Sequence, residues 1–246
     1  MANTESVTGI NSSTGKLVAH IIIRTLVSSI IAFILYVSCT TVAVGIGTKE
    51  IGYTILYSTD EQSYTEVYKH YYKDGDDNNY SRYENDSHYY KTPIRSQLTK
   101  GQTAAAMWTA QCLTLIIMAA SIYGVIWRAG DSDANKAELG GKSVDRLRGI
   151  KIALLANIPF AAFYIAFVLL KIFGIEKKFV LFYKIATYFM FAFNETIMPI
   201  GNAGQVTAGK TACLAVVLLP LIIICVVGYY FGRKHIILKN KIIYKK

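Results

Sequence analysis

The chain has 246 residues, of which 53% are apolar and 17% are charged, and its formal net charge is +10. In soluble domains about a quarter of all residues are charged, which is more than in this chain. The apolar residues here also form long runs of the kind found in membrane proteins. The basic excess lies mostly beside these runs, which favours the loops of a membrane protein and excludes nucleic acid as the expected partner. The composition therefore predicts an all-α transmembrane helical bundle.

The N-terminal residues 1–16 are rich in Ser, Thr and Asn, and this composition predicts a disordered segment. The first apolar run extends from Thr25 to Ile46. A signal peptide has an apolar core of only about 7–15 residues, so this run is too long for one. We therefore expect an uncleaved first transmembrane helix within residues 17–48.

A polar segment, residues 49–103, contains ten of the 18 tyrosines. The alternation in Ser63–Tyr72 predicts a strand, Lys73–Asp76 predicts a turn, and Asn79–Tyr83 is the expected returning strand. We expect a small antiparallel sheet of two to four strands outside the cytoplasm. Tyrosine is enriched at protein interfaces, so the sheet is a candidate surface for a protein partner, but the favoured interpretation is that its rings pack on each other or on the membrane interface.

Four further apolar runs follow, at Ala104–Trp127, Ile152–Phe173, Phe179–Ile200 and Thr211–Phe231. Trp108 and Trp127 are 19 residues apart in the first of these, and a helix of that length is about 30 Å long. Both indoles are therefore expected at membrane interfaces, where tryptophan is favoured.

The distribution of basic residues decides how the run at 179–200 is interpreted. The N-terminal region contributes Lys16 and Arg24, the loop 128–151 has six basic residues, and the tail 233–246 has another six. Cytoplasmic loops carry excess Lys and Arg, and these three regions share one side only if residues 179–200 do not cross the membrane. We therefore expect four full spans plus a re-entrant or interfacial segment at 179–200, with five spans as the alternative. The bundle then covers residues 104–232 of a plasma-membrane protein whose termini are both cytoplasmic.

The loop 128–151 reads RAGDSDANKAELGGKSVDRLRGIK and contains two short patterns. Asp131 and Asp133 form a DxD pair, which can hold a divalent ion with a phosphate but also caps helices beside short loops. The Gly141–Ser143 triplet lacks the earlier glycine of a phosphate-binding loop. Arg146, Arg148 and Lys151 precede the next span and are expected to contact anionic lipid headgroups.

The stretch GDSDANKAELGGKSVDRLRGIKIALLANIP and the closing VGYYFGRKHIILKNKIIYKK carry a family resemblance. They resemble a set of uncharacterised small multi-pass bacterial membrane proteins with a G-D-x-D-x-N loop, an R-G-x-K helix start and a basic I-Y-K-K tail. The resemblance implies no activity. It implies that Gly130, Asp131, Asp133 and Asn135 form one turn, either structural or ligand-binding.

Polar residues inside the apolar runs are the remaining candidates for function. Gln111 and Asn157 are expected to join helices through amide hydrogen bonds, whereas Asn194 and Glu195 lie in the ambiguous run. Ionisable residues within membranes are candidates for transport or gating. The binding candidates are therefore Glu195, Asn194, Asn157, Gln111, Asp131, Asp133 and Asn135.

No catalytic residue, metal site or cofactor is predicted. We expect a non-enzymatic accessory or sensor component of a cell-envelope complex, with a homo-oligomer as a further option. The alternative is a small oligomeric transporter or channel that uses Glu195 and the broken segment 179–200. A metal-dependent lipid-modifying enzyme that uses the DxD pair ranks last.

Overall fold

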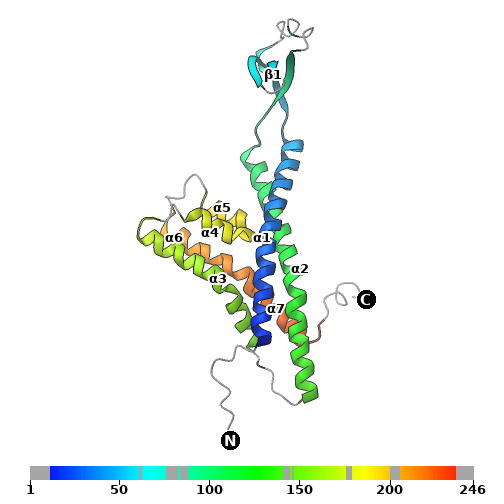
Figure 1. The fold of residues 1–246 in the computed structure, drawn as a ribbon, viewed down its shortest axis with the longest axis vertical. Helices are drawn as coiled ribbons and strands as arrows, with labels where there is room; N and C mark the ends of the chain where they lie inside the picture. Colours follow the sequence, from blue (N-terminus) through cyan, green and yellow to red (C-terminus); the bar gives the residue numbers. More distant parts are fainter. Residues whose placement is uncertain are drawn as a thin grey trace. The chain divides into compact units, whose positions relative to one another are not determined.

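The computed structural model describes residues 12–60, 63–75, 83, 88–140, 145, 147–175, 179–199 and 206–236. Most of these residues are helical, and three strands follow the first helix (Figure 1). The backbone divides into two compact units, Met1–Val37 with Trp108–Lys246, and Ser38–Met107. In chain order the elements are α1 (Ser12–Gly47), β1 (Glu50–Asp60), β2 (Ser63–Tyr71), η1 (Tyr72–Asp74), β3 (Tyr89–Arg95), α2 (Lys100–Gly140), α3 (Arg148–Ile172), α4 (Val180–Ala186), η4 (Tyr188–Met190), α5 (Phe191–Ile197), α6 (Ala208–Cys213), η6 (Leu214–Leu218) and α7 (Leu219–Arg233).

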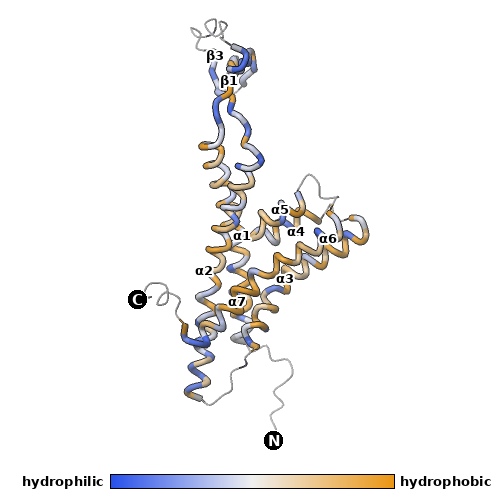
Figure 2. Tube along the Cα trace, turned by 180° about the vertical axis from the view of Figure 1, so that it is seen from behind, coloured by the Kyte–Doolittle hydropathy of each residue, from blue (hydrophilic) through white to orange (hydrophobic). Residues whose placement is uncertain are grey.

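Four helical stretches are long and apolar enough to cross a bilayer. They are Thr14–Gly47, Lys100–Leu139, Arg148–Ile172 and Ala208–Arg233, the last of which combines α6, η6 and α7. Large apolar side chains such as Ile30, Ile116 and Ile223 remain exposed along them. Figure 2 shows apolar residues along most of α3 and α7 and hydrophilic residues near the end of α2. The protein is therefore a multi-pass integral membrane protein, and the predicted fold class is confirmed.

The larger unit has a core to which all four of these stretches contribute. Its buried residues come from every long helix, for example Ile21 of α1, Ile122 of α2, Ala156 of α3 and Leu221 of α7. Membrane helices are held together by dense packing of small and branched side chains. The hydrophobic effect does not drive their association, because lipid tails are as apolar as the side chains. This core holds the long helices together and so sets the positions of the polar residues that they carry.

Two boundaries differ from the sequence prediction. Helix α1 begins at Ser12, inside the segment 1–16 that was expected to be disordered. Helix α2 continues through Gly130 to Gly140, so the turn expected around Asp131, Asp133 and Asn135 is wrong. The polar sequence of that stretch suggested a loop, but one side of the extension packs on α7 and is thereby stabilised as a helix.

Glycines allow this close packing of α2 against α7. A Cβ atom at Gly130 would clash with the backbone carbonyl of Tyr229, and one at Gly232 would clash with that of Trp127. Gly228 and Gly232 are four residues apart and lie on one face of α7, an arrangement that lets helix backbones approach each other in membranes. The helices therefore meet backbone to backbone, and their polar side chains come within bonding distance.

The smaller unit contains the predicted sheet. Its three antiparallel strands are ordered β2-β1-β3, which confirms the expected two to four strands. Strand β2 pairs with β1. The expected returning strand at Asn79–Tyr83 lies outside the described residues, apart from Tyr83. Ring contacts join the tyrosines into a cluster, for example Tyr57 with Tyr89 at a centroid distance of 5.1 Å. The tyrosines thus supply the side-chain packing of a sheet that is too small for a conventional core.

Candidate functional site

The described part of the apolar run at 179–200, which is residues 179–199, forms a helical hairpin. Helices α4 and α5 have seven residues each, so each is about 10 Å long, which is far too short to cross a membrane. The side chain of Asn194 donates to the carbonyl oxygen of Thr187 at 3.2 Å and to its hydroxyl oxygen at 2.9 Å. These bonds join residues that a straight helix would hold about 10 Å apart, so the chain folds back. Figure 1 shows α4 and α5 side by side. We call residues 179–199 the hairpin.

Gln111 of α2 closes the break between the two short helices. Its amide nitrogen donates to the carbonyl of Phe189 at 2.7 Å, and its amide oxygen accepts from the backbone N–H of Ala192 at 3.1 Å. Both backbone groups lie where regular helical bonding is interrupted, and unpaired buried backbone groups are costly. One side chain from a distant helix therefore satisfies both, and Gln111 joins α2 to the hairpin as expected of an intramembrane amide.

An ion pair joins the two arms of the hairpin. The ammonium of Lys184 on α4 lies 2.5 Å from Oε2 of Glu195 on α5. The Lys184 side chain is 9% exposed, whereas that of Glu195 is 36% exposed. The cation is thus the buried member and the carboxylate the accessible one. We call Gln111, Lys184, Thr187, Asn194 and Glu195 the hairpin centre.

The turn of the hairpin contacts the middle of α3. Near the start of the hairpin, Phe179 packs on Phe163 with ring centroids 6.1 Å apart. At the turn, Phe189 packs on Phe160 at 5.4 Å, and Phe160 is the central residue of the 25-residue helix α3. On the other side of the turn, Tyr188 contacts Phe33 of α1 at 6.0 Å. The hairpin centre therefore lies inside the bundle rather than at one end of α3.

Asn157 takes no part in this arrangement. It is buried on α3, and its amide nitrogen donates to the carbonyl of Ala153 one turn earlier at 3.0 Å. Its amide oxygen has no hydrogen-bond partner among the described residues. Within the described structure, Asn157 thus makes no hydrogen bond to another helix, in contrast to Gln111.

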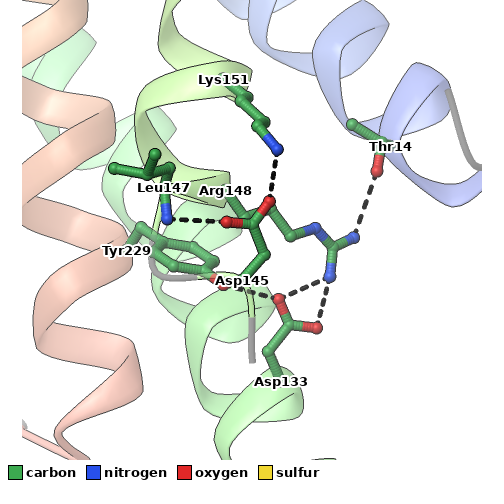
Figure 3. Close-up of polar contacts among 7 residues, drawn as sticks. All are labelled: Thr14, Asp133, Asp145, Leu147, Arg148, Lys151 and Tyr229. Atoms are coloured by element: carbon green, nitrogen blue, oxygen red, sulfur yellow. Dashed lines mark hydrogen bonds and ion pairs between the residues drawn. The ribbon is translucent and has the colours of Figure 1, made fainter. Parts of the chain in front are cut away.

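A second polar cluster joins all four long helices (Figure 3). Asp133 of α2 accepts two hydrogen bonds from Nη1 of Arg148 on α3, the one to Oδ2 at 2.5 Å, and one from the Tyr229 hydroxyl of α7 at 2.8 Å. Arg148 also donates from Nη2 to the hydroxyl of Thr14 on α1 at 3.3 Å. We call these four residues the clasp. Hydrogen bonds in which both partners are charged are stronger than neutral ones, so the clasp restrains the helices at this end.

Three of the four clasp residues come from separate stretches of the sequence. Asp133 comes from the GDSDAN stretch, Arg148 from RGIK and Tyr229 from VGYYFGRKH, and the ring of Tyr229 fills the space left by the missing side chain of Gly149. Three segments that are far apart in the sequence therefore meet in one place.

The two aspartates of the DxD pair have different partners. Because residues i and i+2 of a helix point in different directions, Asp131 does not join Asp133 but lies 2.8 Å from Nδ1 of His235. Asn135 donates to Asp131 at 3.4 Å. Among the described residues, no group of three or more His, Cys, Asp or Glu side chains could hold a metal ion. The pair therefore contributes one carboxylate to each of two contacts rather than two to one ion.

Two ionisable groups beside the clasp have shifted pKa values. The hydrogen bond to Asp131 raises the pKa of His235, and Glu138, 3.5 Å from Nε2, contributes in the same direction. The hydrogen bond from Lys151 lowers the pKa of Asp145, which also accepts from the backbone N–H of Leu147. Arg148 and Lys151 thus each pair with a carboxylate, and Arg146 lies outside the described residues.

No family model matches the chain, and no curated protein or solved structure shows significant similarity to it. The resemblance to multi-pass bacterial membrane proteins is therefore supported only in its coarse content, which is four long apolar helices.

Proposed function

We propose that the protein is a small membrane transporter or channel, working as an oligomer, whose pathway passes the hairpin centre. The observation that carries this proposal is the Lys184–Glu195 ion pair within a broken helical segment that reaches the middle of α3. Ionisable groups inside a membrane are costly and are retained mainly where ions or substrates bind. Non-helical backbone at membrane depth is tolerated where it is buried in protein or lines a water-filled cavity, and discontinuous helices form many transport sites.

The proposed topology is a re-entrant hairpin in a plasma membrane, with both termini cytoplasmic and the sheet on the opposite side. Single cysteines at the exposed positions Ile175 and Lys210, in a background without the four native cysteines, test it in intact cells. Both are expected to react with an impermeant maleimide from the side of the sheet, because the hairpin enters and leaves on that side. A cysteine at Lys136 is the control for the opposite side. Labelling of Ile175 and Lys210 from opposite sides would replace this topology with five spans.

Ion flux from proteoliposomes tests the transport function itself. The purified protein is reconstituted, and efflux of potassium, sodium, chloride and protons is compared with that from empty vesicles. The double variant Lys184→Met/Glu195→Gln removes both charges of the pair while keeping similar side-chain volumes, so it is expected to fold and to lose the flux. A wild-type protein that moves none of these ions, in any oligomeric state that purification yields, contradicts the proposal.

A second candidate function is a non-enzymatic accessory or sensor component of a cell-envelope complex, as the tyrosine-rich sheet suggests. Tyr64, Tyr72 and Tyr90 are at least half exposed, and neither β2 nor β3 has a further strand on its outer side among the described residues. Exposed aromatic residues and open strand edges are typical of protein-binding surfaces. Photo-crosslinkers at Tyr64 and Tyr90 are expected to capture one defined partner in cells. Repeated recovery of the protein alone would count against this function.

The contact with lipid headgroups and the absence of enzymatic activity are also proposals. Anionic lipid headgroups are proposed to contact the basic residues at the start of α3, although Arg148 and Lys151 already have carboxylate partners, which reduces the charge they offer. The protein is also proposed to be non-enzymatic, since Asp131 and Asp133, the residues of the lipid-enzyme alternative, bind separate basic partners.

A further inference from the structure

We propose that Lys184 is a binding site for a small inorganic anion, and that the Glu195 carboxylate occupies this site until an anion displaces it. The proposal names the substrate class of the pathway suggested above, and therefore rests on that function. It follows from the hydrogen-bonding capacity of Lys184, the unequal burial of the pair and the charge around the open end of the hairpin.

The ammonium of Lys184 makes fewer hydrogen bonds to the described residues than it can donate. A lysine ammonium can donate three hydrogen bonds, and Glu195 supplies the one acceptor that the described residues place within bonding distance of it. The residue is 7% exposed, so it has little access to bulk water. A buried cation with donors to spare is stabilised by any acceptor that carries negative charge.

The unequal burial of the pair indicates which partner is exchangeable. The Glu195 side chain is about four times as exposed as that of Lys184, so the carboxylate can leave toward solvent while the ammonium stays in place. Once Glu195 has moved, the buried ammonium requires another negative charge, because an unpaired buried charge is strongly destabilising. A metal cation entering this position would be repelled by the ammonium, whereas an anion takes over the role of the carboxylate.

The residues around the open end of the hairpin favour anions as well. Two described lysines lie near this end, Lys171 in the last turn of α3 and Lys210 in α6. Lys171 donates to the carbonyl oxygen of Val206 and to the Thr211 hydroxyl at 2.5 Å, so it lies between α3 and α6. Basic residues beside an opening raise the local concentration of anions, and Lys and Arg side chains select anions in pores.

Chloride efflux from proteoliposomes loaded with potassium chloride tests the proposal, with valinomycin present to prevent a membrane potential from stopping the flux. The variant Glu195→Gln removes the competing carboxylate, so its flux at low chloride is expected to exceed that of the wild type by about tenfold, which corresponds to about 1.4 kcal/mol. Lys184→Met and the double variant Lys184→Met/Glu195→Gln are expected to fall to the level of empty vesicles. The matched control Lys136→Met, at an exposed lysine of α2, is expected to retain wild-type flux.

The outcomes separate this proposal from the transport function. Flux of potassium or sodium without chloride flux would overturn the anion site and leave transport standing. A Glu195→Gln variant that is as inactive as Lys184→Met would overturn the competition between carboxylate and anion. Absence of any ion flux in the wild type and in all variants would overturn both proposals. Because Lys184→Met leaves an unpaired carboxylate, the charge-neutral double variant decides the role of Lys184 if the single variant does not fold.

Discussion

The clasp and the hairpin centre each place a carboxylate beside a cation inside the helical bundle, but they satisfy those charges differently. In the clasp, Asp133 accepts from both Arg148 and Tyr229, and its side chain is 10% exposed. In the hairpin centre, Lys184 has a single acceptor among the described residues, and the carboxylate of Glu195 is 36% exposed. The first arrangement holds its carboxylate from two helices, whereas the second leaves its carboxylate accessible.

This difference separates a structural contact from a candidate site. A charged side chain that is hydrogen-bonded to several helices keeps its position, because moving any one partner leaves the others unpaired. A pair within one hairpin, with a partly exposed carboxylate and spare donors on the ammonium, is easier to open. Both clusters have the composition expected of functional residues, so their geometry and not their residue types distinguishes them.

The largest expected effect is on the clasp. Asp133→Ala leaves Arg148 and Tyr229 without their shared acceptor, and is expected to lower the free energy of unfolding by about 3 kcal/mol. The partial exposure of Arg148 keeps this value at the low end for buried pairs. Denaturation with sodium dodecyl sulfate, starting from mild detergent, measures the change. Asp131→Ala is the matched control two residues away, and it should have a much smaller effect because its contact with His235 is exposed. Equal losses in both variants would mean that the clasp is no stronger than a surface ion pair.

A smaller effect is expected at the hairpin break. Gln111→Leu keeps the size of the side chain but leaves the Phe189 carbonyl and the Ala192 N–H without partners, at a total cost of about 2 kcal/mol. The same denaturation experiment measures it, and proteoliposome flux shows whether a loosened hairpin alters transport. Asn135→Leu is the control, since that amide makes an exposed contact with Asp131 within its own helix. An unchanged stability for Gln111→Leu would show that the break does not depend on α2.

The smallest effect concerns the contact beside the clasp and depends on pH. The pKa of His235 is raised by its hydrogen bond to Asp131, so protonated His235 stabilises the contact below its ordinary pKa of 6.5. This contribution is lost as the pH rises through the raised value. Trp127 reports on it, because its indole N–H donates to the carbonyl of Ile236 at 2.8 Å.

Nuclear magnetic resonance of the two indole N–H groups provides the measurement. The Trp127 signal is expected to move as the pH is raised above 6.5, while that of Trp108 serves as an internal reference. In His235→Gln the Trp127 signal should no longer respond in this range. A response that persists in His235→Gln would assign the titration to another group.

The sequence by itself determined the four apolar helices, the tyrosine-rich sheet and the interruption of the run at 179–200. These features are local, since a bilayer requires continuous apolar runs and a strand requires alternation over a few residues. It also singled out Gln111, Asn194 and Glu195, because polar groups within apolar runs stand out whatever their partners are.

Only the tertiary structure decided which of these residues meet. Lys184 stands near the start of the broken segment in the sequence, but its pairing with Glu195 depends on the chain folding back after Thr187. The sequence predicted a turn around Asp133, whereas this stretch is helical and packs on α7. Its hydrogen-bond partner Tyr229 lies 96 residues further along the chain. Such contacts arise from close helix packing at glycines and from the need to pair buried polar groups, and neither leaves a local pattern from which the partner can be inferred.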